Sequence, residues 1–173
     1  TAVITDDRGS DNPDVDADIT ANISVANAAN VAEDNASYSK FTISLDAAAA
    51  EDVVATLSLG VDSDAATDNA GSADYVAKYY TLDANGTSYT EITSGEVTLP
   101  AEGTGVDVYV NITDDLLTEN NETFTLTATN KADATDTDTG TAVITDDRGS
   151  DNPDVDADIT ANISCKCSEC CRR

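Results

Sequence analysis

The 173-residue sequence contains no histidine, no tryptophan and no methionine, and it has only 8 lysines and arginines against 34 aspartates and glutamates. The absence of histidine removes the most common acid–base residue, and with it the usual serine and cysteine catalytic triads. A carboxylate pair can hydrolyse glycosides, but without tryptophan there is little aromatic platform for a sugar. No glycine-rich phosphate loop occurs. The sequence therefore predicts a protein that is not an enzyme.

The scarcity of positive charge excludes further classes of partner. The formal net charge is −26 at pH 7, so nucleic acids and anionic membrane surfaces find no basic patch to bind. No apolar run approaches the roughly 20 residues of a membrane-spanning helix, and no membrane insertion is expected. There is no signal peptide and no starting methionine, so we expect a segment of a longer protein.

What the sequence has in excess is aspartate. Of the 34 acids, 26 are aspartates and 8 are glutamates. A merely solvated or salt-adapted surface would use both acids, whereas short carboxylates in turns suit hard cations. Threonine, serine, asparagine and glycine separate small apolar residues, a composition that favours short strands and turns over helices.

An exact repeat organises the chain. Residues 1–24, TAVITDDRGSDNPDVDADITANIS, recur unchanged at 141–164, with a period of 140 residues. Identity over 24 positions predicts that the parent protein is a tandem array, in which the partners of each unit are neighbouring identical repeats. We expect residues 1–18 to be the last strand of a preceding repeat plus an acidic linker, 19–147 to be one domain, and 148–164 to be a linker and the start of the next repeat.

All four cysteines lie in the last nine residues, CKCSECCRR at 165–173. The body therefore uses no disulfide. This tail replaces the VANAANVAE that the repeat predicts there. Its thiols could hold a soft metal ion when reduced, but we interpret the tail as an artificial end or thiol handle.

Short runs of alternating apolar and polar residues between turn signals predict an all-β, immunoglobulin-like antiparallel β-sandwich. In 121–129, Phe124, Leu126 and Ala128 alternate with four threonines, which predicts one buried and one solvent-facing side. In 52–61 the residues expected to be buried are Val53, Ala55, Leu57, Leu59 and Val61. The expected strands are 19–31 (weak, broken and at an edge), 37–45, 52–61, 74–83, 87–92, 95–100, 105–113, 121–129 and 140–145. A polar loop is expected at 62–73, a separating loop at 131–140, a tight Asn85-Gly86 hairpin turn, and no helix or a single turn near 47–50.

Acidic residues gather at the ends of the expected strands. They are Glu33, Asp34, Asp74, Asp114, Asp115, Glu119, Glu122, Asp146 and Asp147. Strand ends far apart in sequence meet at one pole of a sandwich, and acids held that close repel one another unless a cation neutralises them. Ca²⁺, which takes six to eight oxygen ligands, is the first candidate. The alternative is that each acid is an ordinary solvated loop residue.

Three segments resemble the signature of Calx-beta domains, a family named for the regulatory calcium-binding domains of sodium–calcium exchangers and also repeated in large surface adhesins. They are ADYVA (73–77), VYVNITDDLLTENNETFTLTATN (108–130) and GTAVITDD (140–147). The resemblance covers about residues 19–147 and implies a seven-stranded sandwich with Ca²⁺ at one pole. The ligands it implies are Glu33, Asp74, Asp114, Asp115, Glu119 or Glu122, Asp146 and Asp147. Two features depart from the family: Arg148 stands where exchanger domains can carry a third acid, and 62–93 is longer.

The acidic linker offers a second candidate calcium site. Asp14, Asp16 and Asp18 alternate as in an extended chain, but Ile19 and Val25 stand where an EF-hand loop needs glycine and glutamate, so an EF-hand is rejected. We expect calcium to bind at the junction between units and to stiffen it. The candidate ligands are Asp6, Asp7, Asp11, Asp14, Asp16 and Asp18. The alternative is an extended, self-repelling spacer.

Together these observations predict a non-catalytic extender repeat of an extracellular, cell-surface adhesin or filament, made rigid by Ca²⁺. Other domains of the parent protein would bind cell-surface or substratum ligands. Three alternatives stay open: a calcium-sensing regulatory domain, a glycan- or protein-binding adhesion module that uses the 62–93 insertion, and a salt-adapted surface without specific ions.

Overall fold

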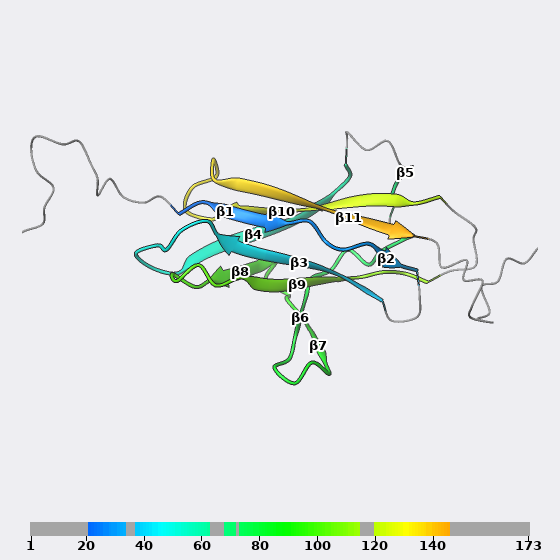
Figure 1. The fold of residues 1–173 in the computed structure, drawn as a ribbon, viewed down its shortest axis with the longest axis horizontal. Helices are drawn as coiled ribbons and strands as arrows, with labels where there is room; N and C mark the ends of the chain where they lie inside the picture. The colour runs from blue at the N-terminus through cyan, green and yellow to red at the C-terminus, as the bar shows by residue number, and fades with distance from the viewer. Residues whose placement is uncertain (1–20, 34–36, 63–67, 72, 115–119, 146–173) are drawn as a thin grey trace, which may run out of the picture.

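In the computed structural model the described residues, 21–33, 37–62, 68–71, 73–114 and 120–145, form two stacked β-sheets (Figure 1). The strands are β1 (Ile23–Ala26), β2 (Val31–Ala32), β3 (Tyr38–Leu45), β4 (Val53–Gly60), β5 (Asp68–Asn69), β6 (Tyr80–Leu82), β7 (Tyr89–Glu91), β8 (Glu96–Leu99), β9 (Val106–Asn111), β10 (Glu122–Asn130) and β11 (Thr137–Thr145). The predicted all-β sandwich is confirmed. These residues include no helix, and so no helix that could cross a membrane.

One sheet has the order β1-β3-β9-β6-β7, and the other has the order β2-β11-β10-β4-β8 with β5 beside β10. Pairing is antiparallel except at two short contacts, β2 with β11 and β5 with β10. β1 belongs to the first sheet and β2 to the second, so the chain changes sheets between Ala26 and Val31. The prediction that 19–31 is broken and lies at an edge is therefore confirmed.

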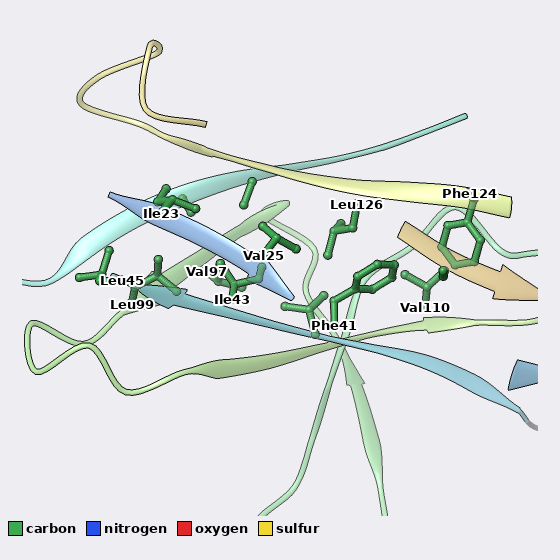
Figure 2. Close-up of a cluster of buried hydrophobic side chains, with 14 of the residues drawn as sticks. Ile23, Val25, Phe41, Ile43, Leu45, Val97, Leu99, Val110, Phe124 and Leu126 are labelled. Carbon is green, nitrogen blue, oxygen red and sulfur yellow. The ribbon is translucent and has the colours of Figure 1, made fainter. Parts of the chain in front are cut away.

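The core lies between the sheets and is built from every second residue of the long strands. Phe41 and Ile43 of β3 and Phe124 and Leu126 of β10 are all fully buried. Figure 2 shows these side chains converging from opposite strands, and the rings of Phe41 and Phe124 meet edge to face with centroids 5.8 Å apart. Each such burial stabilises the fold by about 1.5–3 kcal/mol. The period-two pattern of the sequence thus fixes which side of each strand faces inward.

Two expectations about burial are wrong. Val61 was expected in the core, but β4 ends at Gly60 and Val61 is 57% exposed. Thr123 and Thr125 were expected to face water, but both are buried. β5 pairs with β10 beside Thr123, and Gly60 of β4 approaches the Thr125 hydroxyl so closely that a Cβ there would lie 3.2 Å from it. Neighbouring strands therefore cover the outer side of β10.

Three expectations about where strands lie are also wrong. The polar loop 62–73 contains the two-residue strand β5. The expected strand 74–83 divides into β6 and an isolated bridge between Tyr75 and Ile112. β11 begins at Thr137, inside the segment expected to be a loop, because Thr137 pairs with Thr129 of β10. The described residues form eleven strands, against the seven that the family resemblance implied. The strands of only two or three residues, β2, β5, β6 and β7, account for the difference.

The predicted hairpin is confirmed and projects from the body of the sandwich (Figure 1). Gly86 adopts a φ of 71° in its turn, which favours glycine. The Asp83 carboxylate accepts hydrogen bonds from the backbone N–H groups of Thr87 at 2.7 Å and Ser88 at 3.2 Å. These bonds hold the pKa of Asp83 below its ordinary value.

The hairpin is attached to its sheet largely by aromatic rings, because β6 pairs with β9 only through Tyr80 and Tyr109. Tyr89 of β7 stacks on Tyr38 of β3 with centroids 3.7 Å apart and meets Tyr109 edge to face at 5.2 Å. Tyr80 also contacts Tyr38 edge to face, at 5.7 Å. We call Tyr38, Tyr80, Tyr89 and Tyr109 the tyrosine cluster.

Candidate metal centre

The topology brings four acidic residues to one end of the sandwich, which we call the acidic end. Glu122 opens β10 and pairs with Ile144 near the end of the antiparallel strand β11. Glu33 follows β2, and its N–H donates to the Thr145 carbonyl at 2.9 Å. Asp114 follows β9 at the same end of the neighbouring sheet. Segments separated by as many as 89 residues, from Glu33 to Glu122, therefore finish together.

Asp74 joins this end through a segment that connects the two sheets. The Ala70 N–H donates to the Thr123 carbonyl of β10 at 2.9 Å, and the Thr113 N–H, just after β9, donates to the Asp74 carbonyl at 2.9 Å. The Tyr75 ring stacks on Phe124, with centroids 4.6 Å apart. These contacts place Asp74 near the end of β9 and the beginning of β10.

Two of the four carboxylates are buried. Glu33 and Asp74 are each 6% exposed, and burial of a carboxylate is costly unless hydrogen bonds or a cation compensate it. The Asp74 carboxylate accepts the Gly71 N–H. Asp114 is exposed and Glu122 is partly exposed. Hard carboxylate oxygens that converge from several loops are the ligand type that Ca²⁺ prefers.

The acids in the described part of the chain do not complete a metal centre by themselves. Within it, no three acidic, histidine or cysteine side chains lie close enough together to hold one ion. The other predicted ligands of this end, Asp115, Glu119, Asp146 and Asp147, lie outside the described residues, as do Asp34 and the linker acids Asp6, Asp7, Asp11, Asp14, Asp16 and Asp18. The donor chemistry fits Ca²⁺, and a full coordination shell needs ligands beyond the four acids placed here.

The three lysines of the described part of the chain form their ion pairs with other acids. The lysines of the described residues are Lys40, Lys78 and Lys131, and they pair with Asp107 at 3.1 Å, Glu91 at 2.9 Å and Glu96 at 2.7 Å. None of these three acids is a predicted ligand. These three lysines therefore neutralise acids elsewhere on the surface.

Sequence reasoning missed a structural use of aspartate at the opposite end of the sandwich. Asp46 accepts the Asn22 N–H at 2.7 Å, and Asp136 and Asp138 accept the N–H groups of Ile23 at 2.9 Å and Val25 at 2.7 Å. The Asn22 side-chain amide and N–H hold the pKa of Asp46 below its ordinary value. The alternation of Thr and Asp in 135–139 was the available signal, since it has the period of a strand.

The opposite end also carries an open cavity of about 520 Å³. The beginning of β4 and the residues after β10 line it, with Asp52, Val54, Asn130 and Lys131 among them. The Lys131 N–H donates to the Val54 carbonyl at 2.9 Å and fixes one wall. None of the predicted ligands lines this cavity.

No family model matches the sequence, and no curated protein matches it. Among solved structures, similar chains include the calcium-binding domain CBD12 of CALX1.1 (14% identity, TM-score 0.45, covering 68% of this chain) and the apo-form Calx CBD1 domain (14%, TM-score 0.41, 73% of this chain and 98% of that one). Another is PapD-like domain 7 of human CEP192 (10% identity, TM-score 0.37, 73% of this chain and 85% of that one). The chain spans only 41% of the CALX1.1 chain. These likenesses concern the general path of the chain, and nothing about function follows from them.

Proposed function

We propose that this chain is a non-catalytic, calcium-binding repeat of an extracellular surface protein. The observation that carries the proposal is the convergence of Glu33, Asp74, Asp114 and Glu122 at one end, with two of the carboxylates buried. These residues would hold Ca²⁺ together with Asp115, Glu119, Asp146 and Asp147. Bound calcium would neutralise their repulsion and, because it binds only the folded state, stabilise the fold.

The course of the chain supports the extender role. β1 begins beside Asp136, just before β11 starts, whereas β11 finishes beside Glu33 at the acidic end. The domain is thus entered at one end and left at the other. Because residues 1–24 and 141–164 are identical, consecutive copies would follow one another along the direction of the strands. Such an array holds a terminal module away from a surface, as tandem repeats do.

Calorimetric titration with Ca²⁺ tests the calcium site. The unsubstituted chain is expected to bind with a dissociation constant on the order of 0.1–1 mM, the range of extracellular modules. Asp74→Asn and the exposed Asp114→Asn should each weaken binding at least about tenfold, because each removes a ligand charge. Glu51→Gln, at the opposite end, is the matched control and should bind normally. Absence of binding heat, with an identical melting curve in chelator, would refute the proposal.

The same titration separates the extender from a calcium sensor. A dissociation constant near 1 μM suits a regulatory domain that responds to cytosolic signals, whereas a millimolar constant suits a permanently loaded extracellular repeat. The exact 24-residue repeat favours the extender, because it predicts near-identical copies whereas a sensor needs one or two specialised ones.

The tyrosine cluster favours a second candidate function, recognition of a neutral glycan or a protein. Tyr80 and Tyr89 belong to the 62–93 insertion, and Tyr89 is 39% exposed. Tyrosine offers an apolar ring and a hydroxyl, which is why it is enriched in binding surfaces. Calcium-dependent binding on a glycan array that is lost in Tyr89→Ala and kept in Tyr79→Phe would support it. An array without specific binding would count against it.

A further inference from the structure

The first and last segments of the described fold lie side by side and run in the same direction, with β1 and β2 along β11 (Figure 1). Besides the short β2–β11 ladder, six hydrogen bonds join them in order. They are Ile23 N–H to Asp136 (2.9 Å), Val25 N–H to Asp138 (2.7 Å), Thr141 N–H to Asn27 (2.9 Å), Ala28 N–H to the Thr141 carbonyl (3.0 Å), Thr145 hydroxyl to the Val31 carbonyl (3.3 Å) and Glu33 N–H to the Thr145 carbonyl (2.9 Å). We call residues 23–33 with 136–145 the terminal seam.

Side chains take part in four of these six bonds, because β1 belongs to the other sheet and cannot form a regular ladder with β11. Asp136, Asp138 and Asn27 accept the backbone N–H groups that a ladder would otherwise satisfy. A carboxylate acceptor makes a stronger hydrogen bond than a neutral one. The open edge between the two sheets is therefore closed along its length by bonds between the chain's two terminal segments.

Glycine makes this close approach possible. A Cβ at Gly140 would lie 2.8 Å from Cγ1 of Val25 and 2.9 Å from the Ala26 carbonyl oxygen. The second contact is with backbone, so any side chain at this position must push β1 away from β11. Gly140 thus lets the two segments touch at the middle of the seam.

The direction of the seam matters when the chain is stretched. Tension on a tandem array would reach this domain through Asn22 at one end and Thr145 at the other. Because the two segments are parallel, such tension slides them lengthwise past each other, and it loads all six bonds together rather than one after another. The hairpin β6–β7 lies outside this path.

We propose that the terminal seam is the element of the repeat that resists unfolding under tension, and that Asp136, Asp138 and Gly140 are the residues that give it this resistance. The proposal rests on the extender role proposed above, since only an array is pulled at both ends. The seam contains its own acceptors, so its resistance does not require calcium.

Single-molecule stretching of the full chain, from residue 1 to the C-terminal cysteines, tests this proposal. At a fixed force, Gly140→Ala and Asp138→Asn are each expected to raise the unfolding rate about tenfold or more, because forced unfolding follows the unfolding rate. Gly140→Ala separates β1 from β11, and Asp138→Asn weakens a bond to a charged acceptor. The increase should be the same in calcium and in chelator. If either variant unfolded under tension at the same rate as the unsubstituted chain, the proposal would be overturned.

Val97→Ala is the matched control, because Val97 is a buried core residue of β8, outside the seam. It should lower stability in denaturant while raising the rate under tension less than Asp138→Asn does. If Val97→Ala and a seam variant with the same loss of unfolding free energy in denaturant also unfolded at the same rate under tension, the seam would have only an ordinary structural role. If the unsubstituted chain bound no calcium but the seam variants still unfolded faster under tension, only the proposed calcium site would be refuted.

Discussion

Aspartate has two different uses in this molecule, and the difference depends on what each carboxylate faces. At one end of the sandwich, Asp46 accepts the backbone N–H of Asn22, just before β1, and Asp136 and Asp138 accept backbone N–H groups of β1. At the acidic end, Glu33 and Asp74 are buried where several strands finish. The first use stabilises the fold without an ion, whereas the second suits a cation. The aspartate excess therefore cannot be assigned to calcium as a whole.

The pH dependence of stability should report the first use. Hydrogen bonds from Asn22 hold the pKa of Asp46 below the ordinary 3.8, so the folded state favours the charged form. This contribution is present above about pH 4 and is lost as the pH falls through the folded pKa. Asp46→Asn should therefore lower the melting temperature at pH 6, and the difference should shrink as the pH falls below the ordinary pKa of 3.8 and through the lower folded pKa. An equal difference above and below the folded pKa would contradict this account, and Glu51→Gln serves as control.

Strands with a strict alternation and several partners could be predicted from the sequence. The expected strands 37–45 and 105–113 correspond to β3 and β9, which pair over six residues. The start of β11 was missed, because Thr137, Asp138 and Thr139 contain nothing apolar and only the alternation of Thr and Asp has the period of a strand. Their strand conformation depends on contacts with β10, such as the hydrogen bonds between the hydroxyls of Thr137 and Thr129 (3.0 Å) and of Thr139 and Thr127 (2.8 Å).

The candidate site was predictable to a similar extent. Acids at strand ends were expected to meet, and the fold brings the described ones to one end because strand ends must converge in a sandwich. The tyrosine cluster and the terminal seam were not predicted. Both join residues far apart in sequence, and no local pattern marks such pairs.

The β6–β7 hairpin should respond to substitution as a separate unit. Gly86 has a φ of 71° with nothing within 4 Å of a Cβ added there, so Gly86→Ala adds only backbone strain of about 1–2 kcal/mol. Because β6 pairs with β9 through one residue, hydrogen exchange should quicken in 80–91 with little change in the global unfolding midpoint.

Gly95 provides the matched comparison for the hairpin. Its φ is 66° and it also has open space, but its carbonyl accepts the Leu57 N–H of β4 at 2.9 Å. Gly95→Ala should therefore lower the global unfolding free energy by a similar amount. If both variants shifted the global midpoint equally, the hairpin would be part of the cooperative unit.

The whole molecule carries a net charge of −26, and this excess has two explanations that respond differently to salt. General repulsion is relieved by any salt as the screening length falls from about 10 Å at 0.1 M to about 3 Å at 1 M. A specific site responds instead to a few millimolar Ca²⁺, a concentration at which screening hardly changes. The acidic end, with its buried carboxylates, favours the second explanation.

Melting curves in the two salts distinguish these explanations. Ca²⁺ at ten times its dissociation constant should stabilise the fold by about 1.4 kcal/mol, which raises the melting temperature by about 4 °C for a domain of this size. Asp114→Asn should lose most of this calcium increment but keep whatever increment about 1 M potassium chloride provides. Glu51→Gln should keep both. If potassium chloride stabilised all three proteins as well as calcium did, the acids would form a salt-adapted surface and the acidic end would bind no specific ion.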